Sequence, residues 1–166
     1  ILQRMRELAV QSTNDTNTTS DRGEMQKEMN QLRQEVDRIA GNTEFNTKTL
    51  MTGNYATTGL KFQLGANSGQ FVSLKFASMK ASALGISGVG TTAALSITSN
   101  TSADTAITTI NSAIETVSQE RSKFGAMQNR LEHTINNLRV SGENLQAAES
   151  RIRDLDMAKE MTNYSK

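Results

Sequence analysis

The stretch INSAIETVSQERSKFGAMQNRLEHTINNLRVSGENLQAAESRI, residues 110–152, decides the fold. Every seventh residue in it is apolar, which is the repeat of a helix that buries one stripe of its surface. The neighbouring row mixes apolar residues such as Ile114 with polar ones such as Arg121, a pattern that favours a helix in a bundle over a symmetric two-stranded zipper. The apolar row, or core seam, consists of Ile110, Val117, Phe124, Leu131, Leu138, Leu145 and Ile152.

The helical pattern begins near Ala103 and continues to Lys166, so we predict one long helix over residues 103–166. At ~1.5 Å per residue, a helix of about 60 residues is roughly 90 Å long. A compact chain of this size has a radius of gyration of only about 15 Å. The sequence therefore predicts an elongated rod.

Residues 1–41 predict two helical segments that precede this helix. The first ends in the polar run Ser12–Ser20, whose side chains compete for backbone hydrogen bonds. Ser20 and Asp21 are expected to cap the second helix, and Gly41 to end it. Apolar residues at steps of three and four predict a second core seam, made of Met25, Met29, Leu32, Val36 and Ile39.

Residues 42–102 have a different pattern. Alternating apolar residues over 60–64 and 72–76 predict a β-hairpin, with residues 65–69 as its five-residue connection. Ala94 to Thr98 could add a short strand. The predicted fold class is α+β, mainly α: one domain of long, coiled-coil-like helices with a β-hairpin region.

The composition excludes several classes of protein. The net charge is +1, which gives no support for a nucleic-acid partner or an anionic membrane surface. The absence of Cys excludes disulfides, thiolate nucleophiles and iron–sulfur clusters. Ser, Thr, Asn and Gln make up 60 of the 166 residues, against 33 for Leu, Ile, Val and Phe. This composition predicts either a thin, elongated body with little interior or a body that completes its burial against other copies of the chain.

The sequence has no recognisable catalytic or cofactor motif. His133 is the single histidine and is expected on a helix surface. Asp154 and Asp156 are two residues apart on the predicted helix, so they do not face each other as a catalytic pair would. The glycines at 85, 88 and 90 lack the Lys-Ser/Thr of a phosphate-binding loop. We therefore predict no enzyme activity, no metal and no cofactor.

Several segments resemble bacterial flagellin, in particular flagellins of Gram-positive, Bacillus-like bacteria. They are LQRMRELAVQS, NTEFNTKTL and FQLGANSGQ, and near the end of the chain AMQNRLEHTINNL and ENLQAAESRIRDLDMAKEM. They follow one another in the family's order over nearly the whole chain. The resemblance implies long antiparallel helices packed as a rod, with the β-hairpin region at one end. It also implies a structural subunit that self-assembles into the extracellular flagellar filament for swimming motility, is secreted by the flagellar export apparatus, and needs no cofactor.

The resemblance also implies partners. These are other flagellin subunits, the flagellar export chaperone and export apparatus, the filament cap and junction proteins, and a vertebrate flagellin-sensing Toll-like receptor. The family positions that matter for the receptor match Gln3, Arg4, Leu8 and Glu28. Arg4 and Leu8 are one helical turn apart, so we expect them to present a charge and an apolar knob together.

The sequence departs from the family pattern in two respects, and alternatives to flagellin stay open. It begins within an amphipathic pattern at Ile1, so we expect a fragment without the family's terminal inner helices and with minimal outer domains. A hook–filament junction protein is a related alternative, although EFNTKTL and ESRIRDLDMAKEM favour flagellin itself. A free coiled-coil adaptor would instead form a small, closed oligomer. An enzyme would need a catalytic constellation that the sequence lacks.

Overall fold

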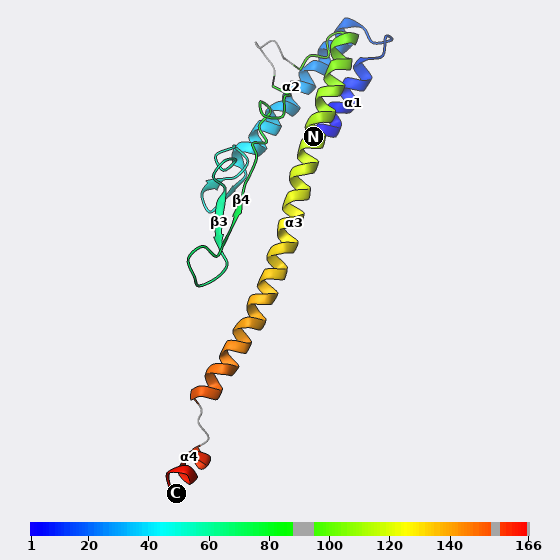
Figure 1. The fold of residues 1–166 in the computed structure, drawn as a ribbon. Coiled ribbons are helices and arrows are strands. Elements are labelled where there is room, and N and C mark those ends of the chain that lie inside the picture. The colour runs from blue at the N-terminus through cyan, green and yellow to red at the C-terminus, as the bar shows by residue number, and fades with distance from the viewer. Residues whose placement is uncertain (88–94, 154–156, 166) are drawn as a thin grey trace. The chain divides into compact units, whose positions relative to one another are not determined.

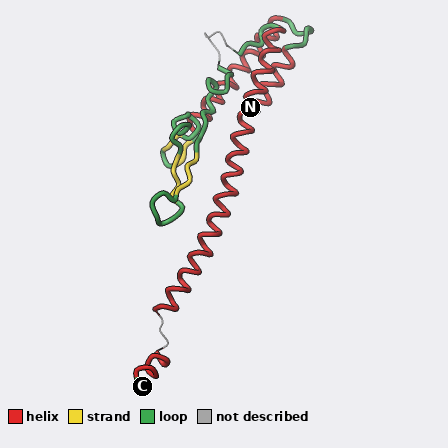
Figure 2. Tube along the Cα trace, in the orientation of Figure 1, coloured by secondary structure: helices red, strands yellow, loops and turns green. Residues whose placement is uncertain are grey.

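The fold is mainly helical, as the sequence predicts, and it contains two small antiparallel hairpins, of which the sequence predicts only the later one (Figures 1 and 2). The computed structural model describes residues 1–87, 95–153 and 157–165. The predictions for Gly88, Gly90, Ala94, Asp154 and Asp156 lie outside these residues. The elements are α1 (Leu2–Ser12), α2 (Thr19–Asn42), β1 (Glu44–Phe45), β2 (Lys48–Thr49), β3 (Leu60–Gln63), β4 (Phe71–Leu74), α3 (Asn100–Arg153) and α4 (Met157–Tyr164).

The chain divides into two compact units, Ile1–Ser122 and Lys123–Lys166. The first contains α1, α2, both hairpins and the beginning of α3, and the second contains the remainder of α3 and α4. Helix α3 has 54 residues, which agrees with the long helix predicted from the heptad repeat. It starts three residues earlier than predicted.

Helix α2 begins at a capping box that the sequence analysis placed two residues too late. Thr18, rather than Ser20, is the N-cap: its Oγ1 accepts from the Asp21 backbone N–H, and the Asp21 carboxylate accepts from the Thr18 N–H at 2.9 Å. The expected stop at Gly41 is also wrong, because α2 continues through Asn42. The helical hydrogen-bond pattern runs past Gly41, because the Thr43 N–H donates to the Ile39 carbonyl at 3.0 Å.

Helices α1 and α2 run antiparallel and are joined at both ends. Near the turn, Arg22 Nε donates to the Ser12 carbonyl at 3.0 Å and Nη2 to the Asn14 carbonyl at 3.2 Å. A cation there satisfies carbonyls that the end of α1 leaves free and complements its dipole. At the other end of the pair, Arg4 contacts Glu28.

The predicted hairpin is confirmed as β3–β4, with shorter strands than expected. Leu60 pairs with Leu74 and Gln63 with Phe71, so residues 64–70 form the connection. The Gln63 side chain donates to two carbonyls within this connection, which holds it as an ordered loop. Residues 95–98, the described part of the other predicted strand, form no strand.

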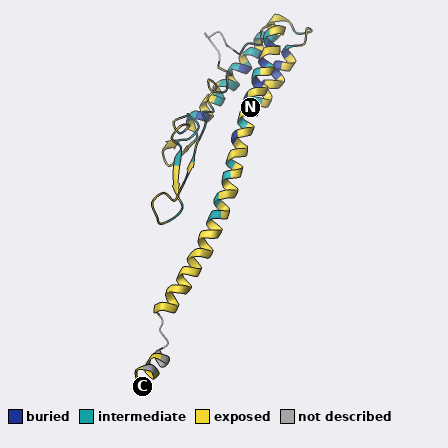
Figure 3. Cartoon of the chain, in the orientation of Figure 1, coloured by how far each residue is buried: buried dark blue, intermediate teal, exposed yellow. Residues whose placement is uncertain are grey.

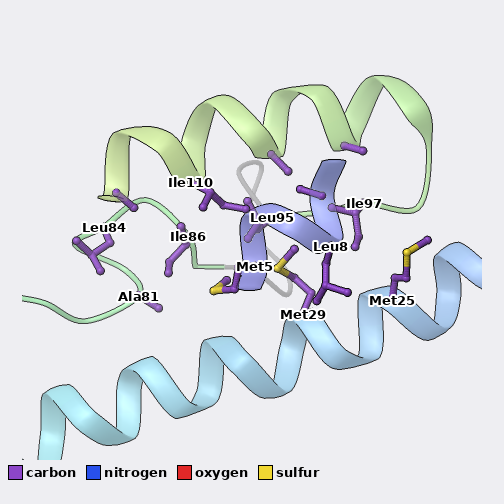
Figure 4. Close-up of a cluster of buried hydrophobic side chains, with 14 residues drawn as sticks. Met5, Leu8, Met25, Met29, Ala81, Leu84, Ile86, Leu95, Ile97 and Ile110 are labelled. Atoms are coloured by element: carbon purple, nitrogen blue, oxygen red, sulfur yellow. The ribbon is translucent and has the colours of Figure 1, made fainter. Parts of the chain in front are cut away.

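The hydrophobic core lies where α1, α2 and the first turns of α3 come together (Figure 4). Alanines on α3 allow close approach, and apolar residues of the connection between the hairpin and α3 complete the cluster. The connection contributes five buried side chains, although it has no regular secondary structure among its described residues. The core consists of Met5, Leu8, Ala9, Met25, Met29, Ala81, Leu84, Ile86, Leu95, Ile97, Ala103, Ala106, Ile110 and Ala113.

Polar side chains of α2 hold this connection in place. The Gln26 side-chain oxygen accepts from Ile97 N–H at 2.7 Å, and its nitrogen donates to the Leu95 carbonyl at 3.2 Å. Eleven residues further along α2, Asp37 accepts from Ala81 N–H at 2.8 Å. These bonds satisfy backbone groups of an irregular segment that lies partly in the core.

Candidate interaction surfaces

The first candidate surface centres on Arg4, which bridges α1 and α2. Arg4 Nε donates to Glu28 at 2.8 Å, and Nη1 donates to Glu7 at 3.2 Å. The hydrogen bond to Glu28, followed by that to Glu7, raises the pKa of Arg4 above its already high value. The Arg4 side chain remains 51% exposed. A charged group held in one orientation yet accessible is a feature that a partner protein can recognise.

The structure brings together only part of the predicted receptor site. Gln3 and Arg4 are exposed on α1, and half-buried Glu28 contacts Arg4 directly. Leu8 is 1% exposed and lies in the core between α1 and α2, so the expectation that it presents an apolar knob is wrong. Arg4 and Leu8 lie one helical turn apart on α1, and the boundary between its exposed and buried surface runs between them. Leu8 lies on the buried side, with Met5 and Ala9.

The core seam of α2 is correct at its beginning and wrong at its end. Met25 and Met29 are buried, and Leu32 and Val36 pack against the core at its edge. Ile39, however, is 41% exposed, and Ala40 takes the inward position. A straight helix turns once every 3.6 residues, so a pattern with a period of 3.5 drifts off the buried side along its length.

The second candidate surface is the later part of the apolar row of α3. Ile110 is fully buried, and Val117, Phe124 and Leu131 are half-buried. The last three residues of the row are exposed: Leu138 by 45%, Leu145 by 71% and Ile152 by 78%. As core residues of this chain, these three predictions are wrong. The core cluster and the apolar side chains packed on it end at Val117, and α3 becomes almost entirely exposed toward its C-terminal end (Figure 3).

Within the described residues there is no group of three or more potential metal ligands. His133 lies exposed on α3. No helix in the described part of the chain is both long and apolar enough to cross a membrane. Charged side chains on the exposed part of α2 also pair: Arg38 pairs with Glu35, three residues away. Residues three apart on a helix are neighbours, whereas adjacent residues do not face each other.

Two protein-family models match the chain. The bacterial flagellin N-terminal helical region matches residues 1–56, and the bacterial flagellin C-terminal helical region matches residues 107–166. The first match contains the Arg4–Glu28 contact, and the second contains the exposed part of the α3 row.

Individual relatives are similar over much of their length. A flagellin of Halalkalibacterium halodurans is 49% identical over 166 residues, which are 100% of this chain and 59% of the relative. A putative flagellin of Bacillus subtilis, YvzB, is 52% identical over 140 residues, or 83% of each chain. The crystal structure of Bacillus cereus flagellin has a TM-score of 0.67 at 34% identity and covers 89% of this chain and 81% of that one.

Proposed function

Because this chain belongs to the bacterial flagellin family, we propose that it is a structural subunit of the bacterial flagellar filament. Flagellin is a structural filament protein and not an enzyme. The main partners of the subunit are other flagellin subunits, and the assembled filament serves swimming motility.

The observation that carries this proposal is the exposed apolar row on α3. Leu138, Leu145 and Ile152 repeat at intervals of seven residues, and each is close to half exposed or more. Such a stripe in water is unfavourable, and packing against a further helix removes it from solvent. Assembly would complete the burial of this subunit. This explains why a chain with so few apolar residues has a heptad row that is apolar at every position.

The test is electron microscopy of filaments from cells that produce the protein as Leu145→Ser. We expect filaments to shorten or disappear, because the substitution removes apolar area that assembly buries. The matched control is Gln146→Ser, a change at the next position of α3, which is also exposed. Long filaments from the Leu145 variant would contradict the role of the row, and a small closed oligomer of the unmodified protein would favour the adaptor alternative.

The same proposal includes location and assembly partners. A filament subunit is secreted and resides in the extracellular flagellum. On its way it binds the export chaperone and the export apparatus, and it then contacts the cap and junction proteins. Mass spectrometry of the culture medium and of sheared filaments tests the location: a protein retained in the cell body would argue against it.

We also propose that a vertebrate flagellin-sensing Toll-like receptor recognises the surface around Arg4. The supporting observation is that Arg4 and Glu28 form one exposed, oriented pair across α1 and α2, with Gln3 beside it on α1. A guanidinium held in this way is a frequent centre of binding energy in protein interfaces. Leu8 contributes by packing in the core, which holds α1 in position, and not by contact with the receptor.

A receptor reporter assay separates these roles. Arg4→Ala is expected to lower signalling about tenfold or more with unchanged circular dichroism, because the loss of a central arginine removes binding energy alone. Arg6→Ala, at another exposed arginine of α1, is the control. Equal signalling by the Arg4 variant and the unmodified protein would reject receptor contact at this surface and leave the filament proposal unaffected.

A further inference from the structure

The charges of the first unit are segregated along the sequence. Between Phe45 and Ala103 the chain has four lysines and no Asp, Glu or Arg. Between Ala81 and Glu120 it has three acidic residues and no Lys or Arg. The lysines, which we call the hairpin lysines, are Lys48, Lys61, Lys75 and Lys80, and all four are exposed.

One of the hairpin lysines lies against an exposed aromatic side chain. Lys61 on β3 pairs with Ser73 on β4, and its Nζ lies 4.8 Å from the centre of the Phe71 ring. Phe71 is itself exposed, and Lys75 follows directly after β4. This side of the β3–β4 hairpin therefore combines lysine cations with apolar surface that is exposed to solvent.

The acidic residues Asp104 and Glu115 lie on one stripe of α3. They are 11 residues apart, which is three helical turns within ~20°, and this places them about 16 Å apart along the helix. Both are exposed, whereas Glu120 is buried. Between them the stripe is polar: Thr108 and Ser112 are exposed and bond to carbonyls of their own helix.

The two charged surfaces do not neutralise each other within one copy. Among the described residues, no ion pair joins a hairpin lysine to Asp104 or Glu115. Resting on the proposed filament function, we infer that the hairpin lysines of one copy dock against the acidic stripe of α3 in the next copy. The occupant of each surface is thus a second copy of this chain.

The filament function, on which this inference rests, also fixes the type of contact. An isologous dimer could pair both charged surfaces reciprocally, but it would close and leave neither surface free for further growth. A heterologous contact pairs unlike surfaces and leaves one of each free, so it can repeat without closing. Exposed ion pairs contribute little energy each. Their role here is to orient and accelerate association, and the apolar surfaces supply the stability.

Zero-length cross-linking with a carbodiimide tests the contact, because it joins only amines and carboxylates that already touch. Filaments are dissociated, mixed from isotopically light and heavy protein and reassembled. We expect mixed-isotope cross-links from Lys61 or Lys75 to Asp104 or Glu115, with a reassembly rate that falls about tenfold or more when salt is raised. Filaments that form without these cross-links would overturn the inference and leave the proposed function intact. Failure to form filaments at all would contradict the proposed function itself.

Charge-reversal variants provide a second test of the contact. One variant carries Lys61→Glu with Lys75→Glu, and the other carries Asp104→Lys with Glu115→Lys. Each alone brings like charges together at every contact, so we expect each to lose filaments. An equimolar mixture restores complementarity at every contact when the two variants alternate, and we expect it to recover assembly.

A matched pair of variants controls for general attraction between oppositely charged proteins. One control variant carries Arg130→Glu with Arg139→Glu, and the other carries Glu132→Lys with Glu143→Lys. All four positions are exposed on α3 in the second unit. We expect mixing to give this control pair no comparable recovery over its separate variants. Equal recovery in both mixtures, or normal assembly by the hairpin variant alone, would overturn the inference.

Discussion

Arg4 and Glu28 are joined by a 2.8 Å hydrogen bond between α1 and α2, while Leu8, one turn after Arg4, is buried beneath them. A charged contact at the surface and an apolar contact in the core thus connect the same two helices. The two contacts are expected to differ in what they contribute. Solvent screens an exposed ion pair, whereas a core leucine is surrounded by close-packed atoms.

Leu8→Ala is expected to lower the free energy of unfolding by about 2–5 kcal/mol, the usual cost of emptying a core leucine site. Arg4→Ala is expected to change it far less. Urea titration followed by circular dichroism compares the two variants. Equal midpoints would show that Leu8 is not a core residue.

Position along α3 is expected to decide what a heptad substitution does. Ile110→Ala should destabilise the first unit by about 2–5 kcal/mol, because Ile110 is fully buried. Leu145→Ala should cost about 0.5 kcal/mol or less in the isolated chain, because its side chain is already in water. Thermal unfolding of both variants measures the difference, and a large effect of the Leu145 change would mean that the chain itself covers this side chain.

Acid is expected to weaken the start of α2 through Asp21. The hydrogen bonds from the Thr18 hydroxyl and backbone hold the pKa of Asp21 below its usual value. A depressed carboxyl pKa contributes stability that is present above the unfolded value of ~3.9 and is lost as the pH falls through the folded value. NMR titration of the Asp21 carboxyl should show this lowered pKa.

Thr18→Val is the control for that assignment, because it removes the hydroxyl and keeps the shape of the side chain. The pKa of Asp21 should rise toward its usual value in this variant. An unchanged titration would mean that the capping box does not cause the shift.

Gln26→Leu is expected to release the segment that Gln26 holds. The Ile97 amide would lose its acceptor, and an unsatisfied, partly buried amide costs about 1–3 kcal/mol. Hydrogen exchange at Ile97 should accelerate accordingly. Gln31→Leu, at an exposed position of α2, should leave that exchange unchanged.

Periodicity predicted the helices and the β3–β4 hairpin because it reports which side of an element is apolar. It does not report what covers that side, so it cannot distinguish the exposed Leu138, Leu145 and Ile152 from core residues of this chain. The buried residues Leu84, Ile86, Leu95 and Ile97 could not be predicted either. They belong to an irregular segment without a repeat, and its position depends on hydrogen bonds to distant side chains of α2.

The predicted receptor surface failed at Leu8 for a related reason. A spacing of four residues places two side chains on the same side of a helix, but the boundary between buried and exposed surface can run between them. Arg4 lies on the exposed side of that boundary, and Leu8 lies on the buried side. The length and charge of the arginine side chain allow it to reach solvent from a position close to the core.

The uninterrupted apolar repeat of α3 has a genetic consequence. A saturation screen that scores the amount of folded protein would find sensitive positions every seven residues, ending soon after Val117. A screen that scores swimming would continue the same repeat, in the same phase, through Ile152. The difference between the two screens would separate, along one helix, the residues that selection retains for folding from those that it retains for assembly.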